Sequence, residues 1–381
     1  MPLVTFVKRY EREFRLPLYR ILRDKLLCHG IAFNLIIGQP DTYEERNIKD
    51  ILKSNPFGPT VRNRYLHFGR RFLSFQNVLA HVKNSALVIV QQSNSEVLNF
   101  LLLAKRSFLL KPKLAYWGHG INFQADNSDS LAQRFKLWHS IYVDHWFAYT
   151  TMTSNILLAN GYPEERITVL NNTIDVTSER MLYDSIAASD VDATRLRYGI
   201  EDGDKVGIFC GSLYKLKGID FLLRSVELVK SRFSRFHFFV LGSGVMENAI
   251  RSFEKDNSQW FHYCGFVSGR EKQIYFRLAD VQLITGVVGL NIIDSFYSQT
   301  PLITTDNPLH SPEIVYLQHG RNGIITGNTL GEYVDGVVAT ISDEDTLVRL
   351  KQRCLEDSAK YTIADMADRF CNGILQTLDK R

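Results

Sequence analysis

Short apolar segments rich in β-branched and aromatic residues recur along the chain, and longer stretches with helical spacing separate them. Near-continuous apolar strands that alternate with helices are typical of parallel sheets covered by helices on both faces. The pattern therefore predicts an α/β protein built from two doubly wound, Rossmann-like domains. The expected strands are 32–37, 86–90, 113–117, 145–149 and 167–170 in the first half, and 206–210, 238–241, 261–263, 281–284 and 302–305 in the second.

A segment without a strand signal, 181–192, interrupts this alternation. We therefore predict an N-terminal domain over 1–177 and a C-terminal domain over 190–358, with the two domains facing each other across a cleft. The remaining residues, 359–381, are expected to form a C-terminal helix that crosses back to the N-terminal domain.

This last segment carries its own helix signals. Thr362 followed three residues later by Asp365 is a capping-box pattern. A single apolar stripe follows at helical spacing, formed by Ile363, Met366, Phe370, Ile374 and Leu378. An amphipathic helix of this kind requires a hydrophobic surface to cover.

The composition agrees with a folded protein of two domains. The chain has 381 residues, of which 45% are hydrophobic and 23% charged, and these values exclude a disordered or collagen-like chain. The longest apolar run, 100–104, is far shorter than the ~20 residues that span a bilayer. The N-terminus becomes charged at Lys8, so it lacks the apolar region of a signal peptide. The five cysteines show no C-x-x-C spacing, which favours a reducing cytoplasm and no structural zinc.

The net charge of +4 hides an asymmetry along the chain. Residues 1–120 contain 19 basic and 8 acidic residues, whereas the remainder contains 26 basic and 33 acidic residues. A basic first third predicts an anionic partner for the N-terminal domain, such as a membrane surface, a lipid diphosphate or nucleic acid. Because no recognised nucleic-acid-binding module accompanies the charge, we expect no nucleic acid as a partner. The alternative is that these cations only solvate helix faces.

A basic segment near the N-terminus carries much of this excess. Its cations are Lys8, Arg9, Arg12, Arg15, Arg20, Arg23 and Lys25, interleaved with Phe6, Phe14, Leu16, Leu18, Ile21 and Leu22. Such a segment can lie at an anionic membrane surface, where each nearby cation contributes roughly 1 kcal/mol. We therefore expect peripheral contact with an anionic membrane, unless these cations only solubilise the first helix.

Four turns in the second half lie where strands end and helices begin, which is where open α/β sheets bind their ligands. The first turn contains Gly211 and Lys217, and the second contains Gly242 and Gly244. Glycine lets a phosphate approach the backbone closely, and a nearby lysine supplies a positive charge. Each of these turns alone is a weak signal, because glycine is common in tight turns.

The third turn, 286–294, opens a helix. It places Val288, Gly289, Leu290 and Asn291 where free N–H groups and the positive helix end can face an anion. Asp294, one turn further on, can accept hydrogen bonds from a ribose, or it is only a carboxylate that favours the start of the helix. The fourth segment, 300–305, is expected to be a buried strand, and the turn after it leads to another helix that starts near Pro312.

Taken in this order and spacing, the motifs resemble the donor-binding half of retaining glycosyltransferases of the GT-B fold, in glycosyltransferase family 4 (glycosyl transferases group 1). The matching segments are 211–218, 242–244, Gly265-Phe266-Val267, 286–294, 299–305 and 322–325 in the second half, and 170–175 and Trp117-Gly118-His119-Gly120 in the first. The resemblance covers essentially the whole chain and is much stronger after Asn171.

The resemblance implies a metal-independent glycosyltransferase without a bound cofactor. It would move a sugar from a nucleotide-diphosphate sugar to a lipid-linked or polysaccharide acceptor with retention, as in bacterial surface-glycan biosynthesis, at the inner face of the cytoplasmic membrane. His119 and Lys217 would act in catalysis, with His119 facing the donor sugar from the N-terminal domain. The nucleotide sugar would contact Gly211, Ser212, Lys215, Gly242, Gly244, Phe266, Val267, Val288, Gly289, Leu290, Asn291 and Asp294.

Three positions depart from the family's pattern. Ser212 replaces an arginine that would contact the diphosphate, although Lys215 is a candidate substitute. The first glutamate of the family's paired glutamates is Gly286, and the second is shortened to Asp294. These changes keep open a second interpretation, a catalytically silent GT-B protein that binds a nucleotide sugar or a partner transferase.

The sequence Asp190-Val191-Asp192 has the D-x-D form of metal-dependent sugar transferases. It directly precedes a helical stretch, so we expect these carboxylates to cap that helix instead of binding a metal.

Overall fold

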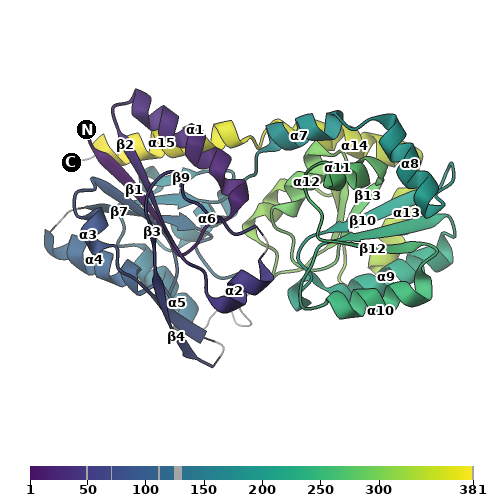
Figure 1. Cartoon of the computed structure of the whole chain (residues 1–381), viewed down its shortest axis with the longest axis horizontal. Helices are drawn as coiled ribbons and strands as arrows, with labels where there is room; N and C mark the ends of the chain where they lie inside the picture. The colour runs from purple at the N-terminus through teal and green to yellow at the C-terminus, as the bar shows by residue number, and fades with distance from the viewer. Residues whose placement is uncertain (49, 70, 110–111, 124–130, 380–381) are drawn as a thin grey trace. The chain divides into compact units, whose positions relative to one another are not determined.

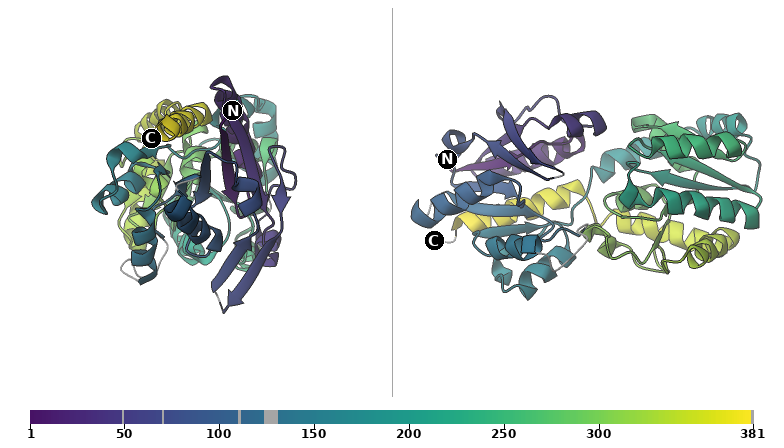
Figure 2. Two further views of the ribbon diagram at one scale, coloured as in Figure 1. Left: turned by 90° about the vertical axis from the view of Figure 1, so that its left-hand side faces the viewer. Right: turned by 90° about the horizontal axis from the view of Figure 1, so that it is seen from below.

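Figure 1 shows the computed structural model of the chain, which describes every residue except 49, 70, 110–111, 124–130 and 380–381. The chain forms two compact units, each with its own parallel sheet. The first unit comprises Met1–Ile174 and Ile363–Arg381, and the second comprises Asp175–Thr362. Helices lie on both faces of each sheet (Figures 1 and 2), so the predicted pair of Rossmann-like domains is confirmed.

The first unit is built on a seven-stranded sheet in the order β3-β2-β1-β6-β7-β8-β9, with all neighbouring strands parallel. A separate hairpin, β4-β5, is antiparallel. The strands are β1 (Leu3–Lys8), β2 (Ala32–Gly38), β3 (Thr60–Val61), β4 (Asn63–Phe68), β5 (Arg71–Gln76), β6 (Leu87–Gln91), β7 (Lys113–Gly118), β8 (His145–Ala148) and β9 (Ile167–Val169).

Residues of α1 and α15 form the core on one face of this sheet, and residues of α3, α4 and α6 contribute to the core on the other. The helices of the first unit are η1 (Glu13–Arg15), α1 (Leu16–Cys28), α2 (Thr42–Asn47), α3 (Leu79–Val82), α4 (Val97–Leu109), α5 (Leu131–Ser140), α6 (Thr151–Ala159), η2 (Glu164–Arg166) and α15 (Ile363–Asp379).

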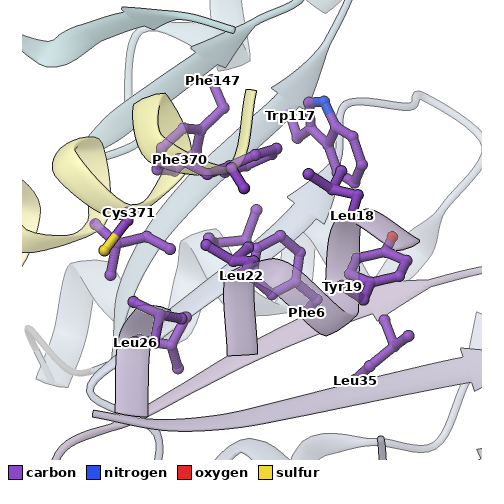
Figure 3. Close-up of a cluster of buried hydrophobic side chains, with 14 of the residues drawn as sticks. Phe6, Leu18, Tyr19, Leu22, Leu26, Leu35, Trp117, Phe147, Phe370 and Cys371 are labelled. Atoms are coloured by element: carbon purple, nitrogen blue, oxygen red, sulfur yellow. The ribbon is translucent and has the colours of Figure 1, made fainter. Parts of the chain in front are cut away.

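The helix α15 packs onto the sheet of the first unit through its apolar stripe (Figure 3). The ring of Phe370 lies 5.0 Å from that of Trp117, centroid to centroid, and nearly perpendicular to it. A Cβ atom at Gly373 would lie 2.5 Å from Oγ1 of Thr168 and 2.7 Å from the ring of Phe147, so only glycine lets the helix approach this closely. The hydrophobic surface that the last helix requires is therefore the sheet of the first unit.

The expected strands omit β1, although it is an interior strand of the first sheet, between β2 and β6. Its residues are almost all buried, yet charged residues follow it directly and no turn signal marks its end. The pattern also omits the two-residue strand β3 and the hairpin β4-β5, of which several residues are exposed.

Much of the basic segment near the N-terminus packs against the rest of the first unit. Phe6, Leu18 and Leu22 are buried in the core (Figure 3), and the side chains of Lys8 and Arg15 are buried as well. Four other cations form ion pairs, namely Arg9 with Glu44, Arg12 with Asp50, Arg23 with Asp24 and Lys25 with Asp368. Much of the segment therefore contacts the protein itself, whereas Arg20 is exposed, and contact of the segment with a membrane stays a prediction.

The second unit is built on a six-stranded parallel sheet in the order β12-β11-β10-β13-β14-β15. The strands are β10 (Lys205–Cys210), β11 (Phe236–Leu241), β12 (Phe261–Gly265), β13 (Val281–Ile284), β14 (Leu302–Thr305) and β15 (Gly323–Thr326). The first five of these were expected from the sequence, and their central residues are buried on both faces of the sheet.

The helices of the second unit include the segment that the sequence predicts as a joint between domains. Residues 181–192 fall in α7 and α8, and the chain leaves the first unit between Ile174 and Asp175. The helices are α7 (Val176–Asp184), α8 (Ala188–Tyr198), η3 (Lys215–Lys217), α9 (Ile219–Arg232), α10 (Glu247–Asn257), α11 (Gly269–Leu278), α12 (Asn291–Tyr297), η4 (Pro312–Tyr316), α13 (Leu330–Ser342) and α14 (Glu344–Ser358).

Candidate functional site

The expected donor-binding turns of the second unit follow four adjacent strands, β12, β11, β10 and β13. Parallel strands end at one edge of their sheet, so the turns are brought together there, at the place where such sheets bind ligands. The glycines let these turns pack on one another. A Cβ atom at Gly242 would overlap the carbonyl oxygen of Gly211, and one at Gly244 would overlap that of Leu213.

The turn after β13 packs directly on η3. A Cβ atom at Gly286 would overlap the carbonyl oxygen of Leu216, so this position has no room for the glutamate side chain that the family pattern places there. Gly218 has a φ of +68°, and a Cβ atom there would lie 3.0 Å from Oγ1 of Thr285. The glycines at 218 and 286 thus serve the close contact between two turns.

Lys217 is held at this contact, and only 9% of its surface is exposed. Its Nζ donates a hydrogen bond to the carbonyl oxygen of Val287 at 2.5 Å. Burial lowers the pKa of Lys217 to about 8, while the nearby carboxylate of Glu313 opposes that shift. One carbonyl satisfies only one of the three donor hydrogens of an ammonium group, so Lys217 keeps donors for an anion. Ser212 and Lys215, earlier in the same turn, are exposed.

Two of the four backbone amides expected to face the diphosphate are already in use. The N–H of Val288 donates to Nδ1 of His310 at 3.0 Å, and Nε2 of His310 lies 2.8 Å from the carbonyl oxygen of Thr305 and donates to it. The N–H of Gly289 donates to Oδ1 of Asn291 at 2.8 Å. The amides of Val288 and Gly289 thus have protein acceptors in this structure, whereas those of Leu290 and Asn291 are the more available candidates, and the contact of all four with a diphosphate stays a prediction.

Asp294 lies in the first turn of α12 and is only 9% exposed. Its Oδ1 accepts hydrogen bonds from Nζ of Lys272 at 2.8 Å and from the hydroxyl of Tyr297 at 3.1 Å. Oδ2 makes no hydrogen bond with the residues that the structure describes. One carboxylate oxygen is thus fixed by the protein, and the other is available to a ribose hydroxyl.

Glu179 of α7 completes this network. Its Oε2 lies 3.5 Å from Nζ of Lys272 and accepts hydrogen bonds from the hydroxyl of Tyr297 at 3.1 Å and from Nε2 of Gln273 at 2.6 Å. Burial by itself lowers the pKa of Lys272, but the negative charge of Asp294, with a smaller effect of Glu179, holds that pKa well above its ordinary value. No sequence signal marks Lys272 or Glu179, because both lie within ordinary amphipathic helices.

The positive charges of Lys272 and Lys217 both influence the pKa of the thiol of Cys210, the last residue of β10. Burial raises the pKa of Cys210 to about 12, and the two lysines oppose this shift while Asp294 and Glu179 add to it. The two cations and two carboxylates therefore lie within electrostatic reach of one thiol, at the same edge of the second sheet.

The loop after β12 presents the expected base-binding residues. Phe266 is 54% exposed, and Val267 is half-buried. An exposed aromatic ring beside a binding edge can stack on a nucleobase, because every base has a π face.

His119 lies in the first unit, directly after β7 and half-buried. Its ring centroid is 4.3 Å from that of Tyr149. Burial lowers the pKa of His119 to about 3, and the positive charges of Lys136, Arg15 and Lys8 add to the effect. The imidazole is therefore neutral at pH 7 and can both donate and accept a hydrogen bond.

Lys8 and Glu96 are two further buried charged groups of the first unit, each 4% exposed and without an ion pair among the described residues. The ammonium of Lys8 lies 3.5 Å from the centroid of the Trp117 ring. Burial lowers the pKa of Lys8 to about 8 and raises the pKa of Glu96 to about 7. Buried groups with shifted pKa values gather at functional sites more often than elsewhere.

Asp190 and Asp192 lie within α8, whose N-cap is Ala187 without a side-chain hydrogen bond, so the prediction that these carboxylates cap the helix is wrong. Oδ2 of Asp190 is instead 2.5 Å from Nη2 of Arg270. Among the residues that the structure describes, no group of three or more His, Cys, Asp and Glu side chains is arranged to hold a metal ion. In the same described part of the chain, no helix has both the length and the apolar composition needed to cross a membrane.

Known proteins resemble this chain in two ways: solved structures share its overall fold, and a family model matches part of the sequence of its second unit. A family model described as glycosyl transferases group 1 matches residues 204–343, which lie within that unit. The crystal structure of HepE of Anabaena in complex with UDP matches with a TM-score of 0.69 at 14% identity, over 98% of this chain and 100% of that one. The chain therefore has the GT-B fold.

Two curated proteins share part of the sequence. EpsD of Bacillus subtilis, described as a glycosyltransferase, is 25% identical over 227 residues, which are 56% of each chain. Alpha-monoglucosyldiacylglycerol synthase of Acholeplasma laidlawii is 28% identical over 148 residues, which are 37% of this chain and 36% of that protein. The matched segments thus span about half or less of these relatives.

Proposed function

We propose that this protein is a glycosyltransferase that moves a sugar from a nucleotide-diphosphate sugar to an acceptor. The observation that carries the proposal is the presence of Lys217 and Asp294 at one edge of the second sheet, within the segment that matches the glycosyl transferases group 1 model. The descriptions of the two curated relatives support it, as do the solved complexes of HepE with UDP and with UDP-glucose.

The diphosphate is held by Lys217, with Lys215 and the amides of Leu290 and Asn291 as further donors. When the bond between the sugar and the diphosphate breaks, negative charge develops on the leaving phosphate. Preorganised donors at that position are worth a few kcal/mol each, which is usually the largest contribution to catalysis. These protein donors and the positive end of α12 supply that charge stabilisation without a metal ion.

The nucleoside is recognised by two features of the same edge. Oδ2 of Asp294 accepts a hydrogen bond from a ribose hydroxyl, and the base stacks on Phe266 beside Val267. Gly211, Ser212, Gly242 and Gly244 complete the turns that surround the nucleotide.

His119 contributes a neutral imidazole that positions a hydroxyl of the donor sugar or of the acceptor. We propose that transfer retains the anomeric configuration, as the family resemblance implies. In that reaction the leaving phosphate takes the proton of the acceptor hydroxyl while the new glycosidic bond forms on the same face of the sugar.

We propose a lipid-linked or polysaccharide acceptor reached from the cytoplasmic side of the membrane. Much of the basic N-terminal segment contacts the protein itself, so we assign the membrane contact to the outer face of α5 and the turn that follows it. The exposed large apolar residues there are Leu131, Phe135 and Trp138 of α5 and Ile141 and Tyr142 of the turn. Phe135 and Trp138 stack at 5.7 Å between ring centroids, and Arg134 beside them is exposed. Aromatic side chains with a neighbouring cation favour the headgroup region of an anionic membrane.

A catalytically silent GT-B protein is the alternative that Ser212 and Gly286 raise. The comparisons do not favour it, since both curated relatives are described as glycosyltransferases or synthases. The close packing of Gly286 on Leu216 also explains why a glycine occupies this position, and this explanation does not require a loss of activity.

A thermal-shift screen of UDP-, GDP- and dTDP-sugars tests the donor. A donor present at one hundred times its Kd stabilises the folded state by about 2.7 kcal/mol, which raises the melting temperature measurably. We expect one nucleotide class to shift the melting temperature and the others to shift it less. No shift with any nucleotide sugar would contradict the proposal.

A further inference from the structure

The first unit contains a polar cavity of about 380 Å³ that the donor site does not use. It is lined by residues that follow β6 and β7 and by residues of α5, namely Gln91, Gln92, Ser93, Asn94, Ser95, Asn122, Ala132, Gln133 and Lys136. Strands β6 and β7 are neighbours in a parallel sheet, so the cavity lies at the carboxyl edge where ligands bind. Its volume is at the lower end of the range for small-molecule sites, about 300–1,000 Å³.

Hydrogen bonds hold the walls of this cavity in place. The amide of Gln133 is bonded twice to the backbone of Asn122, with both distances 3.0 Å. Asn94 donates to the carbonyl oxygen of Ala132 at 2.8 Å, and its Oδ1 lies 3.0 Å from Nε2 of His139. Burial lowers the pKa of His139 to about 4, so this ring is neutral and Nε2 donates to Asn94. These bonds tie α5 to the loops after β6 and β7 and form the cavity without a ligand.

Two groups in the cavity lack protein partners. Gln92 is 5% exposed, and its Nε2 donates to Oγ of Ser140 at 2.5 Å, but its Oε1 is buried without a donor. The ammonium of Lys136 has no ion pair or hydrogen bond among the described residues. Lys136 is the one charged residue among the described lining residues. Lys136 is half-buried. A partly desolvated cation without a partner is unfavourable, and an anion bound beside it offsets that cost.

The charge of Lys136 in this cavity affects the pKa of His119. The positive charge of Lys136 is the strongest charge effect on the His119 ring, and it adds to burial in keeping that ring neutral. Lys136 is thus within electrostatic reach of His119 in the first unit.

We propose that this cavity binds an anionic sugar unit of the acceptor, with its carboxylate or phosphate on Lys136 and a ring hydroxyl donating to Oε1 of Gln92. This inference rests on the proposed function, because it assigns a chemical class to the acceptor of that reaction. A single cation, an unpartnered carbonyl oxygen and walls of amide and hydroxyl groups suit a sugar with one acidic substituent better than a neutral sugar.

The test uses the full chain and three probes, glucuronic acid, glucose 6-phosphate and glucose, titrated by calorimetry or followed by ligand-observed NMR. We expect one of the acidic sugars to bind at least about tenfold more tightly than glucose, because charge-assisted hydrogen bonds are roughly twice as strong as neutral ones. Glucuronic acid as the tighter ligand indicates a carboxylate, and glucose 6-phosphate as the tighter ligand indicates a phosphate. Equal binding of glucose and both acidic sugars would overturn the proposal.

Lys136→Met should remove the preference for the acidic sugar, whereas Lys83→Met, at an exposed position of the same unit, should leave it unchanged. Retention of the preference in Lys136→Met would overturn the proposal. A second measurement needs only the wild-type protein, which covers the case that Lys136→Met does not fold. The preferred acidic sugar should slow the acetylation of Lys136 by acetic anhydride, measured by peptide mass spectrometry, without slowing that of Lys83. Unchanged acetylation of Lys136 would also overturn it.

These measurements separate this inference from the proposed function. Binding of UDP or another nucleotide by the second unit is measured in a separate titration. If no nucleotide binds while the acidic sugar does, the proposed transferase fails and the anionic site remains. If the nucleotide binds and no acidic sugar does, only the present inference fails.

Discussion

Nζ of Lys272 lies 2.8 Å from Oδ1 of Asp294, and the same oxygen accepts a hydrogen bond from Tyr297. This contact fixes the orientation of the carboxylate and leaves Oδ2 without a hydrogen bond to the described residues. Lys272, which no sequence motif indicates, thus orients Asp294, the residue that we assign to the ribose.

Lys272→Met should destabilise the protein by roughly 3 kcal/mol or more, because it leaves the carboxylates of Asp294 and Glu179 largely buried without their cation. Urea denaturation at pH 7 measures this change. Arg270→Met is the matched control on the same helix. Its ion pair with Asp190 is much more exposed and should contribute at most about 1 kcal/mol. Equal losses in the two variants would mean that the Lys272 network is not a structural unit.

Asp294→Asn should weaken binding of the preferred nucleoside diphosphate about tenfold or more, because a hydrogen bond to a charged group contributes about 1.5–3 kcal/mol. Calorimetry measures the dissociation constant, and Asp335→Asn on the exposed surface of the same unit is the control. Equal affinity in wild type and Asp294→Asn would reduce Asp294 to a helix-end carboxylate.

The same network predicts how the ribose is recognised. Since Oδ1 of Asp294 is occupied, the carboxylate recognises one ribose hydroxyl through Oδ2. A deoxyribose nucleotide that keeps that hydroxyl should bind within a few-fold of the ribose form. Titrations of paired nucleotides such as UDP and 2′-deoxy-UDP or 3′-deoxy-UDP measure this, and a large loss with both deoxy forms would show that both oxygens contact the ribose.

His119→Ala should lower the rate of transfer far more than it weakens nucleotide binding, because the residue lies in the first unit and the nucleotide is assigned to the second. Initial rates and calorimetry on the same preparations measure the two effects. A proportionate loss of stability and activity would instead indicate a histidine of the core.

The stability of the protein should also depend on His119. The folded-state pKa is about 3, below the ordinary value of 6.5, so between these two values the unfolded chain binds a proton that the folded protein does not. Stability therefore falls as the pH is lowered through this window. His119→Ala should reduce the fall, as measured by urea denaturation between pH 6.5 and pH 4. An identical fall in the variant would show that the ring is solvated.

The outer face of α5 should govern any attachment to membranes. Replacing both Phe135 and Trp138 by alanine should weaken binding to anionic vesicles, measured by flotation, by about a hundredfold or more, because each large apolar side chain contributes roughly 1.5–3 kcal/mol when buried. Leu196→Ala, an exposed apolar position of the second unit, and Arg20→Gln, an exposed cation of the basic segment, should have no effect. Loss of flotation in Arg20→Gln alone would return the membrane contact to the N-terminal segment.

Much of the second unit could be predicted from the sequence. Its strands are buried on both faces, so they form continuous apolar runs, and parallel strands bring the turns that follow them to one edge. The same reasoning predicts that Lys217 and Asp294 lie at this edge, and their roles stay predictions. The order of motifs along the chain was enough to place them together.

The features that the sequence did not reveal depend on contacts between distant segments. The amide of Val288 is occupied by His310, and Asp294 is paired with Lys272, 22 residues away in each case. The basic segment has the pattern of an amphipathic surface, but its strand β1 is an interior strand of a sheet. Its cations form ion pairs with carboxylates as distant in the sequence as Asp368. The periodicity of apolar residues predicts a local helix or strand, but it does not predict which distant residue a side chain will contact.

The role of Lys217 in a sugar transfer is the central claim, and the release of nucleoside diphosphate tests it most directly. Wild type, Lys217→Ala and the exposed control Lys255→Ala are each incubated with UDP-, GDP- and dTDP-sugars and a cell lipid extract. We predict release from one donor class by wild type and Lys255→Ala, and at least about a hundredfold slower release by Lys217→Ala, as for the loss of one charge-stabilising donor. The melting temperature of each variant confirms that it is folded. Release by Lys217→Ala at the wild-type rate, or no release from any donor by the wild type, would contradict the account.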